Sequence, residues 1–227
     1  MFNLIKEVES RFKLLNSRYE RKVKINKNNL IFYKNFFLKS CFSKQFPDQI
    51  IESVYFDDGD LNFAKSNING EFYRIKPRIR WYNNDLKKTV CEFKIKKGFN
   101  GYKVNTKELY SQNDTESVII NKTKLFLRDL FKVSLNEIIH IKYRRTYLKH
   151  PSGIRLTLDR DLSYKLSNTK INKSLDFEVL EFKYDYSKDN YFRNNIFNKF
   201  SEIPIRLNLS LFCLIKFKVD VPIEPVA

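Results

Sequence analysis

A row of four cations runs along one short stretch of the chain, residues 72–82, which read FYRIKPRIRWY. The period of two of a β-strand places the cations on one face, namely Arg74, Lys76, Arg78 and Arg80. Like charges on one strand face repel each other, so this row needs anions opposite it. Those anions could be protein carboxylates, a ligand such as a phosphate, whose oxygens arginine and lysine bind, or both.

Carboxylates share a strand face with cations in four further stretches. Glu20 lies in residues 18–25, Glu92 in 90–96, Asp159 in 154–159 and Glu181 in 177–184. The cations on the same faces are Lys22, Lys24, Lys94, Lys96, Arg155 and Lys183. Carboxylates suit hard cations such as Mg²⁺ or Mn²⁺, which bridge phosphates to protein. Such a site could transfer phosphoryl groups by positioning and charge neutralisation alone. The pattern is also compatible with a solvated sheet that carries ordinary Glu–Arg cross-strand pairs.

The alternating stretches predict the elements that must position these side chains. We expect strands at residues 18–25, 50–56, 72–82, 90–96, 139–148, 154–159, 177–184 and 206–213. Helical periodicity predicts helices at residues 3–16, 30–38, 60–67, 113–135 and 188–200. A closed sheet with the helices outside would cover the apolar faces and enclose the charged ones. The predicted fold class is therefore α+β, an antiparallel β-barrel of about eight strands that forms a cationic tunnel, with helices packed outside.

Composition limits the partners and the compartment. The chain of 227 residues fits one domain, and its formal net charge of +17 predicts a polyanionic partner: nucleic acid, an anionic membrane surface or phosphorylated small molecules. No apolar run approaches the roughly 20 residues that span a bilayer, and no signal-peptide core is present, which predicts a cytoplasmic location. Cys91 and Cys213 lie on apolar faces and are expected to be core residues. His140 and His150 are too isolated for a zinc site or a catalytic triad.

Seven short motifs, in order, resemble the VTC domain, the polyphosphate polymerase branch of the triphosphate tunnel metalloenzymes (CYTH-like superfamily). They are residues 20–22 (ERK), 55–57 (YFD), 76–82 (KPRIRWY), 92–94 (EFK), 143–146 (YRRT), 155–159 (RLTLD) and 181–183 (EFK). The resemblance implies one such domain over residues 1–227, with the motifs between 18 and 213. It implies an antiparallel barrel that transfers the γ-phosphate of ATP to a growing polyphosphate chain, with Mn²⁺ or Mg²⁺.

The same resemblance implies roles for individual residues. The catalytic set would be Lys22, Arg78, Arg80 and Glu181. Phosphate-binding residues would be Lys22, Lys24, Lys76, Arg78, Arg80, Lys94, Arg145, Arg155 and Lys183, and Arg74 shares their polar face. Glu181 is the leading metal ligand, supported by Glu20 and Glu92, whereas Asp159 could orient an arginine. The implied partners are ATP or triphosphate and polyphosphate, and a membrane protein that takes the product is compatible with this activity.

The chain departs from the family on its last expected strand, where the family carries a Ser-Lys pair. Residues 206–211 read RLNLSL, so Arg206, Asn208 and Ser210 would face the tunnel without a lysine, and Lys216 lies farther along. Two alternatives therefore stay open: a triphosphate or nucleoside triphosphate hydrolase, and a non-catalytic module that binds polyphosphate or inositol pyrophosphates. Nucleic acid is not expected, because Tyr73 and Trp81 lie opposite the cation row and cannot stack bases beside it.

Overall fold

The computed structural model describes residues 1–11, 19–98, 100–106, 108–167, 169 and 171–199. The helices in this part of the chain are α1 (Phe2–Arg11), α2 (Leu30–Lys39), α3 (Asn62–Ile68), α4 (Glu116–Phe131) and α5 (Asp189–Asn195), with short 3-10 turns η1 (Lys27–Asn29), η2 (Tyr186–Lys188) and η3 (Phe197–Lys199). The strands are β1 (Tyr19–Asn26), β2 (Ser43–Lys44), β3 (Gln49–Asp57), β4 (Tyr73–Tyr82), β5 (Asp85–Lys97), β6 (Asn100–Thr106), β7 (Asn136–Lys149), β8 (Arg155–Leu166), β9 (Asn172–Ser174) and β10 (Phe177–Tyr184).

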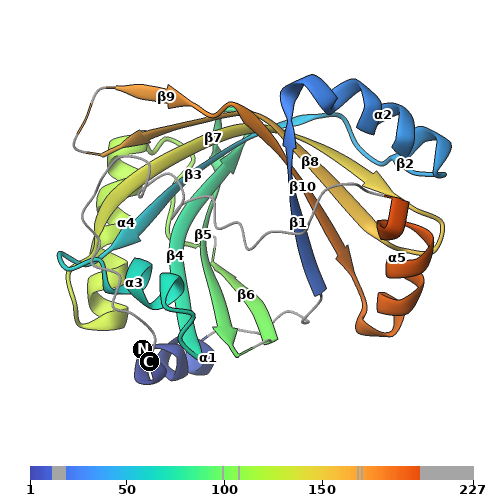
Figure 1. The fold of residues 1–227 in the computed structure, drawn as a ribbon. Coiled ribbons are helices and arrows are strands. Elements are labelled where there is room, and N and C mark those ends of the chain that lie inside the picture. The colour runs from blue at the N-terminus through green and yellow to red at the C-terminus, as the bar shows by residue number, and fades with distance from the viewer. Residues whose placement is uncertain (12–18, 99, 107, 168, 170, 200–227) are drawn as a thin grey trace.

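These strands form one antiparallel sheet that curls strongly (Figure 1). Eight of them follow the order β1-β10-β8-β7-β3-β4-β5-β6, while β2 pairs with β7 and β9 pairs with β8. Over the described residues the sheet is a half-barrel, with β1 and β6 at the two ends of the strand order. The predicted α+β class and antiparallel barrel of about eight strands are confirmed, in the form of a half-barrel over the described residues.

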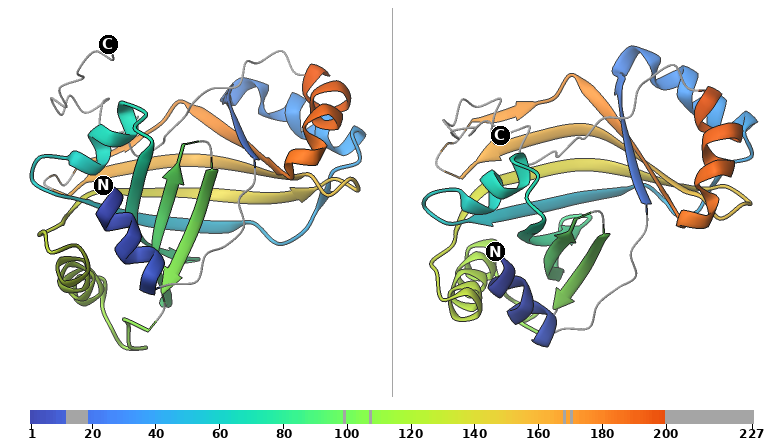
Figure 2. Two further views of the ribbon diagram at one scale, coloured as in Figure 1. Left: turned by 90° about the horizontal axis from the view of Figure 1, so that it is seen from below. Right: turned by 60° about the horizontal axis from the view of Figure 1, so that its bottom comes forward.

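Helices α1, α2, α4 and α5 pack on the convex side of the sheet (Figure 2), whereas α3 contributes Phe63 to a convex cluster and Ala64 to the concave one. Apolar residues of α1 and α4 cover β4, β5 and β6 in a cluster that contains Ile5, Val8, Ile79, Phe93, Val104, Ile119 and Leu127. Residues of α2 and α5 cover β1, β8 and β10 in a second cluster that contains Val23, Tyr33, Phe37, Leu156, Leu180, Phe182 and Phe192. Because strand side chains alternate, burying these apolar faces outside turns the charged faces inward.

The concave side is itself divided. Apolar side chains fill one part of it, including Ile51, Ile141, Tyr164, Phe177 and Val179. Farther along β7, β8 and β10 the same face becomes polar, with Arg145, Thr157, Asp159 and Glu181. The apolar part gives the curled sheet a core on its inner side, and the polar part carries charged and hydroxyl side chains.

Several boundaries differ from the expected ones. β6, β2 and β9 were not predicted, and β8 runs to residue 166 instead of 159. Within β8, Asp161 adopts a positive φ of 54°, and the register with β7 shifts between Lys142 and Arg144. This bulge lets both Asp159 and Leu162 face inward, which interrupts the period of two that marks a strand. The expected strand at 206–213, with Ser210 and Cys213, lies outside the described residues.

No helix in the described ranges is long and apolar enough to cross a membrane. Cys91 is fully buried, as predicted, and packs in the cluster under α1 and α4.

Candidate functional site

Strand β4 carries its cation row along the concave face, between β3 and β5. The register places Tyr55 of β3 and Glu92 of β5 on either side of Arg78. Arg78 Nη2 lies 2.6 Å from Glu92 Oε2, and its Nη1 donates to the Tyr55 hydroxyl at 3.0 Å. Two neighbouring strands therefore fix this guanidinium in a single orientation.

Arg80 is held by neutral groups. Its Nε donates to Ser53 Oγ at 2.9 Å and its Nη2 to the Tyr143 hydroxyl at 3.2 Å. Among the described residues, the carboxylate that forms an ion pair with Arg80 is Glu92, whose Oε2 lies 4.0 Å from Nη1. Arg80 is only 7% exposed, so its charge is buried with little neutralisation by the protein. Such a guanidinium is suited to an anionic ligand.

Glu92 is the counter-ion of this group. Its Oε1 accepts from Lys103 Nζ of β6 at 2.8 Å, and its Oε2 accepts from Arg78. Burial alone would raise the pKa of Glu92, but Arg78, Arg80 and Lys103 hold the pKa far below its ordinary range. The predicted role of Glu92 as a metal ligand is hard to combine with these contacts, because cations occupy both of its oxygens.

A second group of charges lies across the concave face on β7, β8 and β10. Arg145 makes a bidentate pair with Asp159, at 2.6 and 2.7 Å. Its Nη2 also lies 3.7 Å from Glu181, which in turn lies 3.5 Å from Lys183 Nζ. Burial would raise the pKa of Glu181, but Lys22, Lys183 and Arg145 hold it well below the ordinary value. The expected role of Asp159, orienting an arginine, agrees with this geometry.

One ion pair joins β1, at one end of the strand order, to β5, the strand next to the other end. Lys94 Nζ of β5 lies 2.6 Å from Glu20 Oε2 of β1, although seventy-four positions separate the two residues in sequence. The curl of the sheet therefore brings β1 opposite β5. Glu20 also lies diagonally across from Glu181, because Glu20 opposes Lys183 and Lys22 opposes Glu181 in the β1–β10 register.

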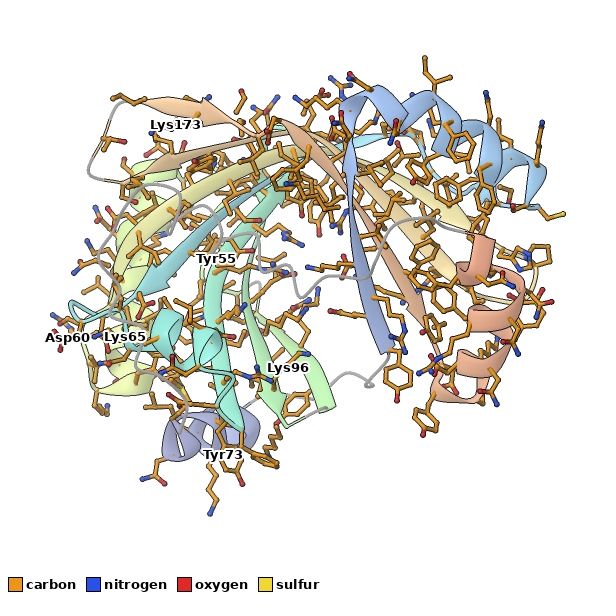
Figure 3. The ribbon with its side chains drawn as sticks, in the orientation of Figure 1. Tyr55, Asp60, Lys65, Tyr73, Lys96 and Lys173 are labelled. Carbon is orange, nitrogen blue, oxygen red and sulfur yellow. The ribbon has the colours of Figure 1, made fainter. Side chains whose placement is uncertain are left out.

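Several lysines on this face have no carboxylate contact within the described ranges. Burial lowers the pKa of Lys76 well below its ordinary value, and the charges of Lys94 and Lys22 lower it further. Burial and Lys94 also lower the pKa of Lys96. Figure 3 shows Lys96 on the side of the curled sheet that faces β1. A bound anion would relieve the repulsion among these lysines.

The remaining predicted residues lie toward the margins of the face. Lys24 Nζ stacks 4.5 Å from the centre of the Phe177 ring, and Arg74 donates to the Gly98 carbonyl at 3.2 Å. Arg155 is exposed at the end of β8, opposite Lys183. The predicted residues thus share one face, with Lys22, Lys76, Arg78, Arg80, Lys94, Arg145, Lys183, Glu20, Glu92 and Glu181 in its polar part.

The three predicted metal ligands do not form one cluster. In the part of the chain that the structure describes, no three histidine, cysteine, aspartate or glutamate side chains are gathered as metal ligands. Glu181 and Glu20 remain the carboxylate pair, and the charge of Glu181 acts to raise the pKa of Glu20 against the opposing effect of Lys94. Two carboxylates offer the hard oxygen donors that Mg²⁺ and Mn²⁺ prefer, so their chemistry fits a cation that takes its other ligands from phosphate and water.

Four residues that the sequence analysis did not select complete the site: Ser53, Tyr55, Tyr143 and Lys103. Tyr143 shares a strand face with Arg145, which was a usable signal. The sequence did not indicate a role for Lys103, because it lies in β6, a strand that was not predicted. Burial would raise the pKa of the Tyr55 hydroxyl, but Arg78 and Arg80 beside it lower it below the ordinary value, which shows how positive the surroundings are.

Comparisons with known proteins agree with this geometry. The chain resembles the PH1819 protein of Pyrococcus horikoshii, with a TM-score of 0.52, 16% identity, and coverage of 88% of this chain and 97% of that one. It also resembles a putative adenylyl cyclase from Hippeastrum, described as having a dominant triphosphatase activity, with a TM-score of 0.53 and 11% identity over 91% of this chain and 99% of that one. A putative adenylate cyclase from Vibrio parahaemolyticus matches with a TM-score of 0.52 and 10% identity, over 86% and 98% of the two chains.

These identities establish a shared fold only. No curated protein matches the chain by sequence. The VTC domain family matches residues 17–213, nearly the whole chain and all seven motifs. With its curled antiparallel sheet and inward-facing cations, the chain belongs to the VTC domain family.

Proposed function

We propose that this protein is a metal-dependent polyphosphate polymerase, which transfers the γ-phosphate of ATP to a growing polyphosphate chain on the concave face of the sheet. The observation that carries the proposal is the charge imbalance of that face. Arg78 and Arg145 are paired with carboxylates, while Arg80, Lys76 and Lys96 add positive charge without a hydrogen-bonded carboxylate among the described residues. A chain of phosphates supplies many anionic oxygens in a row, which matches a row of cations.

The residues would divide the work of binding. Arg78, Arg80 and Arg145 are fixed by Glu92, Ser53, Tyr143 and Asp159, so they would orient the reacting phosphates with little loss of side-chain entropy. The flexible lysines would follow the phosphate chain as it lengthens. Lys103 would act through Glu92, as a positioning residue.

The transfer itself needs no protein nucleophile. A terminal oxygen of the acceptor polyphosphate forms a bond to the γ-phosphorus of ATP, and the bond from that phosphorus to the β–γ bridging oxygen breaks, which releases ADP. The acceptor oxygen is already anionic at neutral pH, so no general base is required. The arginine charges would stabilise the negative charge that spreads over the transferred phosphoryl group.

Glu181 and Glu20 would hold the divalent cation, Mn²⁺ or Mg²⁺. A bound cation would supply positive charge that offsets the negative charge of the phosphates. Glu92 would remain the counter-ion of Arg78 and Lys103.

Hydrolysis of triphosphate or of a nucleoside triphosphate is the second candidate. The fold is shared with a protein described as having a dominant triphosphatase activity. The same cations would then bind the substrate, and water would replace the polyphosphate acceptor. Binding without turnover is the third candidate, favoured by the absence of lysine from residues 206–211.

The deciding experiment incubates the purified full chain with ATP and Mn²⁺ and separates the products. Long-chain polyphosphate and ADP in matching amounts are expected, with both lost in Glu181→Ala. Free phosphate and ADP without polymer would replace the proposal with hydrolysis. Tight binding of tripolyphosphate without any product would replace it with a binding module.

Binding of tripolyphosphate should weaken as salt rises, because it depends on many charge contacts. We expect the affinity, measured by calorimetry in KCl, to fall by about tenfold or more between about 0.1 and 1 M salt, as the screening length shortens from about 10 to about 3 Å. An affinity that stays constant over this range would contradict a cationic binding face.

Binding should also take up protons through Lys76. Its pKa is lowered in the free protein, and phosphate oxygens would raise it again, so the affinity should fall as pH rises between these two pKa values. Calorimetry in buffers of different ionisation enthalpy measures the uptake directly. Lys76→Arg keeps the charge and should abolish the uptake, whereas Lys24→Arg should leave it unchanged. If Lys76→Arg takes up as many protons on binding as the unaltered protein does, the proton goes to a group other than Lys76.

A further inference from the structure

Helix α2 leaves large apolar side chains in water. Tyr33 and Phe37 pack inward against the sheet, but Ile31, Phe32 and Leu38 are 72%, 62% and 70% exposed. Ile31 and Leu38 are two turns apart, so they lie on the same side of the helix. A ten-residue helix that buries one apolar side and exposes another is unusual for a surface helix, whose outer side is normally polar.

Lysines flank these exposed side chains. Lys34 lies beside Ile31 and Leu38 on one side of the helix, and Lys39 lies beside them on the other, near Phe32. Lys27, in the turn before the helix, is exposed as well. No acidic residue occurs between Glu20 and Asp48, so the whole segment around α2 is free of negative charge.

We propose that this outer face of α2, made by Ile31, Phe32, Lys34, Leu38 and Lys39, docks on the surface of an anionic phospholipid membrane. The apolar side chains would enter the boundary between headgroups and acyl chains, and the lysines would contact anionic headgroups. A second copy of this chain does not fit, because a symmetric contact would set these lysines against one another.

The location of α2 is compatible with a working site. The inward side of α2 packs on the convex face of β1, β8 and β10, while the candidate site uses the concave face of the same strands. Figures 1 and 2 show α2 on the outside of the curl. Docking would therefore leave the concave face accessible, and it does not depend on what reaction that face performs.

The test is sedimentation of the full chain with phospholipid vesicles in physiological salt. The protein should bind phosphatidylcholine vesicles that contain phosphatidylserine, and bind neutral phosphatidylcholine vesicles much more weakly. Phe32→Ser with Leu38→Ser should lower the partition coefficient by about tenfold or more. Lys34→Gln with Lys39→Gln should lower it by about fivefold or more.

The matched control is Leu125→Ser on α4, a residue 56% exposed in another part of the surface, which should bind as the unaltered protein does. Saturating tripolyphosphate should leave vesicle binding intact, because the concave face is separate. The proposal is overturned if the unaltered protein does not bind, if Leu125→Ser loses as much as the α2 variant, or if tripolyphosphate releases the protein. It is also overturned if Phe32→Ser with Leu38→Ser abolishes self-association, measured by sedimentation velocity, but leaves vesicle binding unchanged.

Discussion

Arg80→Ala is expected to reduce kcat/KM for polyphosphate formation by about a hundredfold or more, the loss seen when one preorganised charge donor is removed from a transition state. Arg80 is the buried arginine whose hydrogen bonds go to neutral groups, Ser53 and Tyr143. Its positive charge is therefore the least neutralised of the three fixed guanidiniums. The measurement is the steady-state rate of polymer formation from ATP over a range of substrate concentrations.

The matched control is Arg144→Ala. Arg144 lies on β7, which is separated from β4 by β3, and its side chain is on the convex side, where it pairs with Asp161 at 3.3 Å. We expect it to retain the rate, since it does not reach the concave face. Arg80→Lys keeps the charge but loses the two fixed hydrogen bonds, and should recover only part of the activity. Equal rates for Arg80→Ala and Arg144→Ala would show that the concave face is not the reaction site.

Much of this site could be predicted from the sequence because strand parity is a rigid constraint. A period of two assigns each side chain to a face without any knowledge of strand pairing. The alternation in residues 73–81 therefore separated Arg78 and Arg80 from Trp81 correctly, and the register confirms that Arg78 faces the same side as Glu92. The same period of two places Glu181 and Lys183 of β10 on the concave face, where the register sets them opposite Lys22 and Glu20 of β1.

What could not be predicted depends on contacts between distant strands. The pair between Lys94 and Glu20 forms only because the sheet curls, which no local pattern reveals. The role of Glu92 depends on Lys103 in β6, a strand that the sequence did not indicate. Ser53 and Tyr143 are uncharged, so a search for charged residues passes over them although they hold Arg80.

The contrast between arginines and lysines on the concave face also emerged only from the structure. Arg78 and Arg145 have carboxylates placed to match the planar guanidinium, whereas Lys22 and Lys76 have no ion pair within the described ranges. Fixed arginines are suited to holding a transition state, and mobile lysines to holding a chain of changing length. The division is not uniform, because Lys94 and Lys183 are paired with Glu20 and Glu181.

Glu92→Gln is expected to lower the free energy of unfolding by about 3 kcal/mol or more, because it leaves the buried guanidinium of Arg78 without its counter-ion. Tripolyphosphate should then stabilise the variant more than the unaltered protein, since its oxygens can take the place of the lost carboxylate. The pKa of Glu92 is held low, so its contribution is complete above the unfolded pKa and is lost only as pH falls through the folded one. The difference in the free energy of unfolding between Glu92→Gln and the unaltered protein should thus persist at about pH 4 and become smaller in stronger acid.

Urea unfolding with and without tripolyphosphate measures both effects, and Glu52→Gln is the matched control. Glu52 is also buried, but it lies on the convex side of β3 and pairs with Lys142 at 3.3 Å. That variant should lose stability without any additional stabilisation by tripolyphosphate.

The Mn²⁺ concentration needed for activity should be unchanged in Glu92→Gln and raised in Glu181→Gln. A raised Mn²⁺ requirement in Glu92→Gln, with unchanged stability, would instead make Glu92 a metal ligand, because a counter-ion cannot be removed from a buried arginine without a loss of stability.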